Sequence, residues 1–205
     1  MVRTDRLRDR HRRLRGGGEG DLRYHRAEPG QGQRVPLRHR QVDEDLVRGR
    51  LRVEPGDGVV GAGTGGIAAA LQSASSGAAT VVVEQTNMLG GMLTAAGVSC
   101  TDGNDKLYSG IWQRFRNALY EHYHTNNLAA GWVSNTCFEP HIGDSIFKSW
   151  AAKEKKLSVF YNWYFDKTLK AGNKVTGAGF INKAGQKLLV YAAITIDATD
   201  LGDVF

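Results

Sequence analysis

The most constraining feature of the sequence is a Gly-x-Gly-x-x-Gly turn at residues 61–66, because it stands between an apolar run and a helix-favouring segment. The apolar run is Val59-Val60, and the segment after the turn, 67–74, is rich in alanine. Residues 80–84 then form a β-branched run, typical of a buried parallel strand. This order predicts a βαβ unit and hence an α/β fold with a Rossmann-like parallel sheet.

Each glycine of the turn has a predicted physical role. Gly61 permits the tight turn, Gly63 lets the backbone approach a pyrophosphate, and Gly66 lets the helix pack closely on the strand. The positive end of the helix would then face the phosphates. Glu84 ends the second strand, where a carboxylate accepts hydrogen bonds from a ribose diol and repels a 2′-phosphate, so NADP is disfavoured.

The rest of the chain reads as two helices followed by strands. Apolar residues at helical spacing predict a helix over about 109–123, and a second helix is expected after Pro140. Residues 157–165 read as a strand. The runs 175–181 and 187–196 flank a turn-rich break and read as a β-hairpin.

Composition divides the chain at residue 57. Residues 1–57 contain 15 Arg and no Lys, whereas 58–205 contain 2 Arg and 10 Lys. Such a switch suggests that 1–57 are translated from the wrong frame, and we expect this Arg-rich tail to be disordered or mis-translated. The tail carries the basic charge while the remainder is nearly neutral, so nucleic acid is not an expected partner. No targeting segment or apolar run long enough to cross a membrane is readable, which leaves the compartment unassigned.

Three motifs together resemble the FAD domain of glutathione-reductase-type flavoproteins. These are Val60 through Glu84, the following Leu89-Gly90-Gly91-Met92, and Ile194 to Thr199, which is similar to the family strand ending in Ala-Thr-Gly but has Asp200 at the third place. More narrowly, the segments 90–98, 132–135 and 138–140 resemble a bacterial FAD-dependent oxidoreductase group sometimes labelled xanthan-lyase-like. The resemblance covers about residues 59–204 and does not fix a substrate.

The resemblance implies FAD as the cofactor and assigns its binding residues. The pyrophosphate would lie at the glycine turn and the adenosine ribose at Glu84, while the remaining positions would lie near the adenine, the ribityl chain or the glycine turn. The full set implied is Gly61, Gly63, Thr64, Gly65, Gly66, Glu84, Gln85, Gly91, Met92, Ala198 and Thr199. Gly90 is expected to serve the turn itself.

The family likeness also predicts the sheet order. The strand near 158–163 would lie outside that of 80–84, followed by the first strand and then the strand ending at Asp197, with the hairpin as a crossover on one face. Only Val59 and Val60 precede the first glycine, and family members continue past Phe205. We therefore expect 58–205 to be the N-terminal part of an FAD-binding domain, incomplete at both ends and lacking its substrate domain.

Two other functions remain open, an NAD-dependent dehydrogenase module and a non-catalytic gene fragment. No catalytic residue is identified, and the substrate and the oligomeric state are unassigned. Weaker candidates are Cys100 as a redox thiol, and Glu139 with His141 as an acid–base pair. For Cys100 the favoured role is that of a small buried residue, and for Glu139 and His141 it is helix capping and loop hydrogen bonding. Metal sites at His122 with His124 and at the polar turn 102–105 are less favoured than structural roles.

Overall fold

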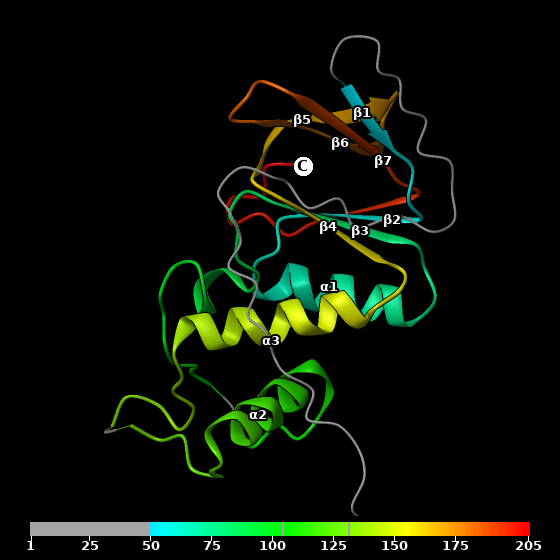
Figure 1. The fold of residues 1–205 in the computed structure, drawn as a ribbon. Coiled ribbons are helices and arrows are strands. Elements are labelled where there is room, and N and C mark those ends of the chain that lie inside the picture. Colours follow the sequence, from blue (N-terminus) through cyan, green and yellow to red (C-terminus); the bar gives the residue numbers. More distant parts are fainter. Residues whose placement is uncertain (1–49, 104, 131) are drawn as a thin grey trace, which may run out of the picture. The chain divides into compact units, whose positions relative to one another are not determined.

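A computed structural model describes residues 50–103, 105–130 and 132–205, all within one compact unit. The helices and strands appear in Figure 1. The first part of the chain order is β1 (Arg50–Val53), β2 (Asp57–Val60), α1 (Thr64–Ser75), β3 (Thr80–Glu84), η1 (Gly91–Leu93), α2 (Gly110–Tyr123) and α3 (Pro140–Lys153). The second part is β4 (Leu157–Tyr161), β5 (Trp163–Ala171), β6 (Lys174–Asn182), β7 (Lys187–Tyr191) and β8 (Ile194–Asp197).

A parallel sheet with the order β4-β3-β2-β8 forms the centre of the unit. β2 pairs in parallel with β3 on one side and with β8 on the other, so Val59 lies between Val82 and Ile196. β4 extends the sheet beyond β3, with Tyr161 opposite Glu84. The α/β class, the parallel sheet and the predicted strand order are confirmed.

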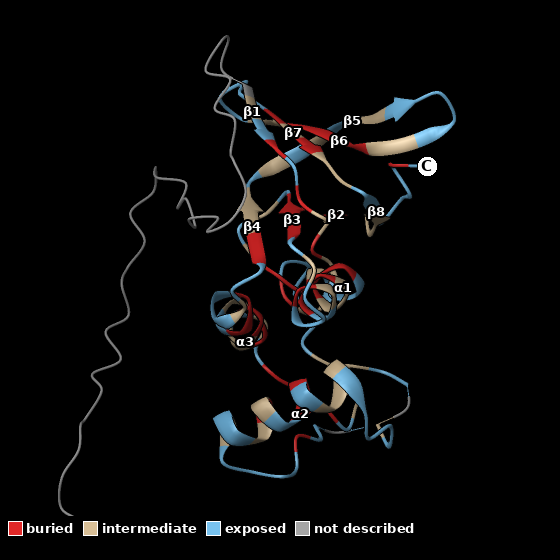
Figure 2. Cartoon of the chain, turned by 90° about the vertical axis from the view of Figure 1, so that its right-hand side faces the viewer, coloured by how far each residue is buried: buried red, intermediate tan, exposed pale blue. Residues whose placement is uncertain are grey.

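The central strands are buried on both faces, and their side chains alternate between two cores. Val59 and Val82 point toward the helices, whereas Val60, Val81 and Val83 belong to a second cluster that faces the other sheet. This alternation follows from the period of two along a strand. Burial on both faces also explains the three consecutive valines of β3, since every side chain of that strand is buried (Figure 2).

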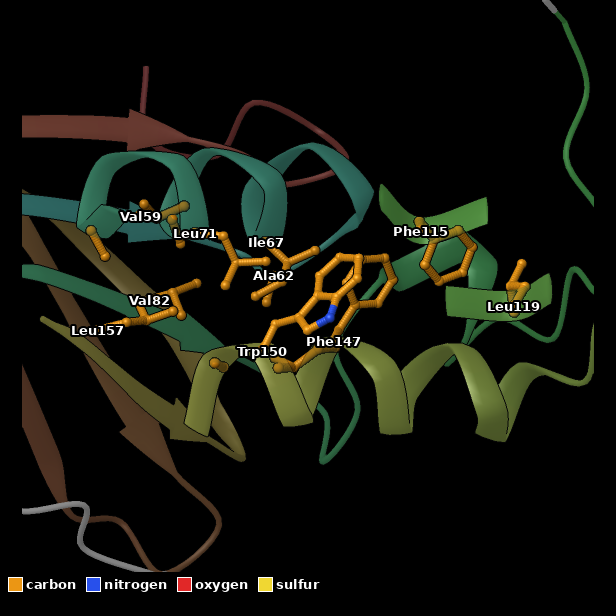
Figure 3. Packing of buried hydrophobic residues seen from close by; sticks show 14 of the residues in the cluster. Val59, Ala62, Ile67, Leu71, Val82, Phe115, Leu119, Phe147, Trp150 and Leu157 are labelled. Carbon is orange, nitrogen blue, oxygen red and sulfur yellow. The ribbon is translucent and has the colours of Figure 1, made fainter. Parts of the chain in front are cut away.

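α1 and α3 cover one face of the parallel sheet, and α2 packs against α3 (Figures 1 and 3). Phe115 of α2 stacks on Phe147 of α3 with ring centroids 4.9 Å apart, and Trp150 meets both rings edge-on. Ile67 and Leu71 of α1 complete this core beneath the sheet. The predicted helices at 109–123 and after Pro140 are confirmed as α2 and α3.

A second sheet, with the order β1-β7-β6-β5, covers the opposite face of the parallel sheet. β5, β6 and β7 form an antiparallel meander, which contains the predicted hairpin as β6 and β7. The predicted strand 157–165 is wrong in extent, because Asn162 adopts a left-handed φ of 64° and separates β4 from β5. Likewise 187–196 is two strands, since the chain leaves the meander after Tyr191 and re-enters the parallel sheet at Ile194.

Ordered structure begins before the compositional boundary at residue 57. β1 pairs in parallel with β7, and Val53 is buried in the cluster between the sheets. β2 also begins at Asp57, so the first strand is longer than Val59-Val60. The tail expected to be disordered or mis-translated therefore contains an edge strand, for which a four-residue Arg-Leu-Arg-Val alternation is enough. Residues 1–49 lie outside the described residues.

Within the part of the chain that the structure describes, no helix combines the length and apolar character needed to span a membrane.

Candidate functional site

The glycine turn connects the carboxyl end of β2 to α1, at the centre of the parallel sheet. Gly61 has a φ of 89°, and its amide donates to the carbonyl of Val83 at 2.9 Å. A Cβ added at Gly66 would lie 2.1 Å from the carbonyl oxygen of Gly61, so that position has no room for a side chain. These two glycines therefore set the turn and the close packing of α1 on the sheet.

Gly63 and Gly65 differ from Gly61 and Gly66, because no protein atom fills the space beside them. A Cβ added at Gly63 would have as its nearest neighbour the Ala198 carbonyl oxygen, at 3.9 Å, and one added at Gly65 would meet nothing within 4 Å. Gly63 also has an ordinary backbone conformation, with a φ of −56°. Glycine at position 63 is therefore explained neither by strain nor by packing against this chain.

The amino terminus of α1 offers unsatisfied donors at the same place. Among the described residues, the amides of Gly65 and Gly66 have no hydrogen-bond acceptor, and no side chain caps the helix. Thr64 and Gly65 are exposed, and no acidic residue lies in the first turn of α1. The positive end of the helix dipole and these amides together suit a bound anion.

The carboxylate of Glu84 lies directly against the glycine turn. Its Oε2 accepts from the amide of Ala62 at 2.7 Å, and its Oε1 accepts from the amide of Thr86 at 2.8 Å. Glu84 is 7% exposed, so these bonds hold a buried carboxylate in one position. Each oxygen retains a further lone pair, which leaves the group able to accept from a ligand hydroxyl. Glu84 thus has a structural role that its position in the sequence does not reveal.

The Gly90-Gly91 loop lies beside the glycine turn as a second wall. The amide of Gly90 donates to the carbonyl of Ala62 at 2.8 Å, and the Thr64 hydroxyl donates to the carbonyl of Gly90 at 2.9 Å. A Cβ added at Gly91 would lie 2.7 Å from the Cα of Gly63. Gly90 has a φ of 113° and a Cβ there would meet Phe147, which agrees with its expected role in the turn.

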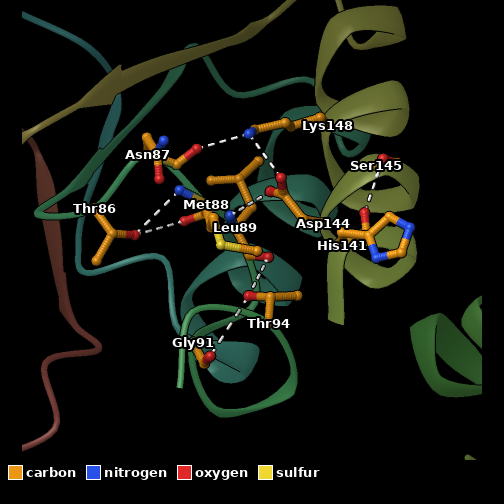
Figure 4. A network of polar contacts seen from close by, with 10 residues as sticks. All are labelled: Thr86, Asn87, Met88, Leu89, Gly91, Thr94, His141, Asp144, Ser145 and Lys148. Atoms are coloured by element: carbon orange, nitrogen blue, oxygen red, sulfur yellow. Dashed lines mark hydrogen bonds and ion pairs between the residues drawn. The ribbon is translucent and has the colours of Figure 1, made fainter. Parts of the chain in front are cut away.

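A polar network centred on the buried Asp144 of α3 holds this loop in place (Figure 4). Asp144 accepts from the amide of Leu89 at 2.9 Å through Oδ1 and from Lys148 Nζ at 2.7 Å through Oδ2. The same ammonium group donates to the carbonyl of Asn87 at 2.6 Å. Asp144 and Lys148 were missed by sequence reasoning, because their partners lie 55 and 61 residues away. Their i,i+4 spacing on one helix was the signal available.

Tyr161 on β4 lies next to this network. Burial raises the pKa of its hydroxyl well above the ordinary range, and the negative charges of Asp144 and Glu84 raise the pKa further. The phenol is therefore a neutral hydrogen-bonding group at physiological pH.

The strand end at 197–199 closes the other side of the glycine turn. The amide of Ala198 donates to the carbonyl of Val60 at 2.9 Å. A Cβ added at Gly61 would lie only 2.6 Å from the carbonyl oxygen of Ala198, so this carbonyl packs directly against Gly61. The Thr199 hydroxyl donates to Asp197 at 2.7 Å and accepts from the amide of Asp203 at 2.8 Å. Ala198 and Thr199 thus lie beside the glycine turn, and Thr199 is engaged in the turn that follows β8.

Burial opposes ionisation of Asp197, but hydrogen bonds from the Thr199 hydroxyl, the amide of Thr199 and the amide of Val204 outweigh it and lower the pKa of this carboxyl below its ordinary value.

The remaining candidates lie at varying distances from this cluster. Gln85 directly follows β3 and is exposed. Met92 lies in η1 and is 62% exposed. Glu139 accepts from the hydroxyl of Tyr123 rather than from His141, which is exposed. No group of three metal-ligating side chains occurs in the described residues, which include His122 and His124. A small cavity between the two sheets, lined in part by Gly58, contains none of the candidate cofactor-binding residues.

The residues present fit the adenosine diphosphate part of FAD. The glycine turn offers free amides, open space beside two glycines and no acidic side chain in the first helical turn. The carboxylate of Glu84 touches the same turn, and the Gly90-Gly91 loop and Ala198 form its walls. A parallel sheet with this site at the carboxyl ends of its strands is the arrangement of a dinucleotide-binding domain.

Comparison with known proteins agrees with this class. The profile of the FAD dependent oxidoreductase family matches residues 58–205, and the chain belongs to that family, whose cofactor is FAD. No curated protein matches the chain.

Three solved structures show the same fold at low sequence identity. THI4 of Thermovibrio ammonificans has a TM-score of 0.51 and 17% identity, covering 74% of this chain and 60% of that one. The myxobacterial chondrochloren halogenase CndH, a variant of FAD-dependent halogenases, has a TM-score of 0.50 and 14% identity, covering 72% and 37%. The flavin-dependent brominase Bmp2 has a TM-score of 0.50 and 18% identity, covering 72% and 38%. The chain spans less than two thirds of each of these proteins.

Proposed function

We propose that this chain provides the adenosine-diphosphate-binding part of an FAD-dependent oxidoreductase. The observation that carries the proposal is the open space beside Gly63 and Gly65, in the same turn whose α1 amides are free and whose Ala62 amide binds the carboxylate of Glu84. The pyrophosphate is assigned to the turn 61–66, with the amides of Gly65 and Gly66 as its donors, and the adenosine ribose to Glu84. Gln85 is assigned to the adenine, and Gly91 and Met92 to the ribityl side.

In this proposal the chain's own residues bind and orient, while bound FAD supplies two-electron redox chemistry. The amides of α1 neutralise part of the diphosphate charge at a helix amino terminus. Glu84 accepts from ribose hydroxyls and, being held by Ala62 and Thr86, does so without reorganisation. Asp144 fixes the Gly90-Gly91 loop that borders the cofactor.

The reaction partner is proposed to be a small reduced molecule that gives up a hydride, and no nucleic acid or membrane is involved. None of the described residues is assigned a catalytic role. The chain alone is proposed to hold FAD weakly and to lack turnover, because affinity depends on enclosure and the described glycine turn is open on its ligand side.

Ligand titration of the full chain tests the cofactor assignment. FAD, ADP and riboflavin would be titrated separately while tryptophan emission and calorimetric heat are recorded. We expect FAD and ADP to compete for one site and riboflavin to bind at least tenfold more weakly, since it lacks the diphosphate. Binding of NAD⁺ in preference to FAD would favour an NAD-dependent dehydrogenase module, and no binding of FAD or ADP would contradict the proposal.

A further inference from the structure

The two cysteines of this chain lie opposite each other, although 36 positions separate them in the sequence. Cys100 and Cys137 form an isolated antiparallel β-bridge, and both are half-buried free thiols. The bridge joins the segment that follows the Gly90-Gly91 loop to the segment that leads into α3. The only two thiols in the sequence are therefore neighbours in space.

The hydrogen bonds around this bridge define its geometry. The amide of Thr101 donates to the carbonyl of Thr136 at 3.1 Å, and the amide of Phe138 donates to the carbonyl of Ser99 at 2.9 Å. These bonds flank the two cysteines rather than join them, so Cys100 and Cys137 are a non-hydrogen-bonded pair. Such a pair has its Cα atoms about 4.5 Å apart, with both side chains on the same face of the ladder.

That geometry lies within the range that a disulfide requires. Bridged cysteines have Cα atoms roughly 4.4–6.8 Å apart and Cβ atoms roughly 3.5–4.5 Å apart. The closely spaced antiparallel pair, with Cα and Cβ separations both about 4.5 Å, lies at the near end of the first range and at the far end of the second. The Cys137 thiol now makes a weak contact with the carbonyl of Ser134, at 3.8 Å. Rotation of the two side chains, with a small adjustment of the backbone, then brings the sulfurs together.

We propose that Cys100 and Cys137 are a dithiol–disulfide pair, a redox modification site separate from the FAD site. The oxidant is a small-molecule disulfide of the glutathione type. One cysteine, as its thiolate, attacks this disulfide, forms a mixed disulfide and releases one small thiol. The second thiolate then attacks the protein sulfur of the mixed disulfide and releases the second small thiol. The two cysteines lose two protons and two electrons in total, and the small disulfide gains them.

The disulfide would tether the segment between Cys100 and Cys137, which contains α2, to the rest of the domain. This segment begins and ends at the bridge between the two cysteines. Within it, α2 also contacts α3 through the stacking of Phe115 on Phe147. The outgoing segment is also tied to the cofactor-side loop, since the amide of Val98 donates to the carbonyl of Met92 at 3.1 Å. Closing a loop of this length restricts the unfolded chain, so oxidation raises the thermal midpoint by about 5–10 °C.

Thiol mapping of the full chain tests the pair. The reduced protein would be equilibrated with mixtures of oxidised and reduced glutathione, and the remaining thiols would be alkylated before digestion with trypsin. Cleavage places Cys100 in peptide 53–106 and Cys137 in peptide 117–148. We expect these two peptides to be linked by a disulfide in the oxidised protein, with both thiols lost together and the yield unchanged by tenfold dilution.

Single variants serve as matched controls, because each leaves one thiol in the same surroundings. Cys100→Ser and Cys137→Ser should each retain a glutathione adduct on the remaining cysteine and show no gain in thermal midpoint on oxidation. Two stable glutathione adducts on the wild-type protein, linkage only between separate chains, or two thiols still alkylated in excess oxidised glutathione would each overturn the proposal. The measurement involves no flavin, so its result is independent of the proposed function.

Discussion

At Gly66 even one additional carbon atom would collide with the backbone, whereas the adjacent Gly65 faces open space. A Cβ at Gly66 would lie 2.1 Å from the Gly61 carbonyl oxygen, and one at Gly65 would meet nothing within 4 Å. We therefore expect Gly66→Ala to lower the free energy of unfolding by about 2 kcal/mol or more. The matched variant Gly65→Ala should change it by less than about 1 kcal/mol. Urea unfolding of both variants measures the difference, and equal effects would contradict the close packing of α1 on the turn.

Asp197 is expected to make the stability of the domain depend on acid pH. Its pKa is lowered in the folded protein, from an ordinary value of 3.8, by hydrogen bonds from Thr199 and Val204 that outweigh its burial. A lowered folded-state pKa adds stability above the unfolded-state pKa, and this stability is lost as pH falls through the folded-state value. The stability difference between wild type and Asp197→Asn should be constant above about pH 5 and shrink below pH 3.8. Denaturant unfolding across that range measures it, and a difference independent of pH would contradict the assignment.

The helix α3 is expected to hold the Gly90-Gly91 loop in place at the cofactor site through a single carboxylate, that of Asp144. Asp144→Ala removes the acceptor of the Leu89 amide and leaves Lys148 without its ion-pair partner. We expect FAD affinity to fall about tenfold, because the Gly90-Gly91 loop loses its anchor, and stability to fall by about 1–3 kcal/mol. Lys148→Ala keeps the Leu89 bond and should reduce affinity less. If the two variants weakened FAD binding equally, the loop would depend on the ion pair rather than on the bond to Leu89.

The elements that the sequence predicts well are those specified by local chemistry. The valine run of β3, the glycine turn and the helical spacing of α2 and α3 each specify an element through residues that are close in sequence. The break at Asn162 was not predictable in this way, because the run from Leu157 to Phe165 reads as one continuous strand. The strand β1 was not predicted, because four alternating residues are too few to distinguish a strand from a charged coil.

The candidate site was predictable only where its residues are close in sequence. The glycine turn and Glu84 belong to one βαβ unit, so their proximity follows from the topology of that unit. The carboxylate of Asp144 reaches the loop from a helix 55 residues later, and its bond to the Leu89 amide arises from tertiary packing alone. The two backbone bonds of Glu84 were likewise not visible, because both partners are main-chain amides.

For the whole molecule, the parallel sheet acts as a rigid platform between two apolar layers. Helices cover one face and the meander covers the other, so β2 and β3, which end at the glycine turn and at Glu84, are buried on both faces. The turns at the carboxyl ends of these strands are therefore held by the core as well as by the hydrogen bonds that join them to each other. Such a platform explains how a ligand site made mostly of backbone is positioned with few specific side chains.

The assignment of FAD requires that the diphosphate of the cofactor, and not the protein, fills the space beside Gly63. Calorimetric titration of FAD into the full chain and its Gly63→Ala variant tests this most directly, with urea unfolding of each as the check on folding. Because an added methyl group meets no protein atom closer than 3.9 Å, the variant should keep wild-type stability within about 1 kcal/mol. Its FAD affinity should fall at least tenfold. Unchanged FAD affinity in a stably folded Gly63→Ala protein would contradict the account.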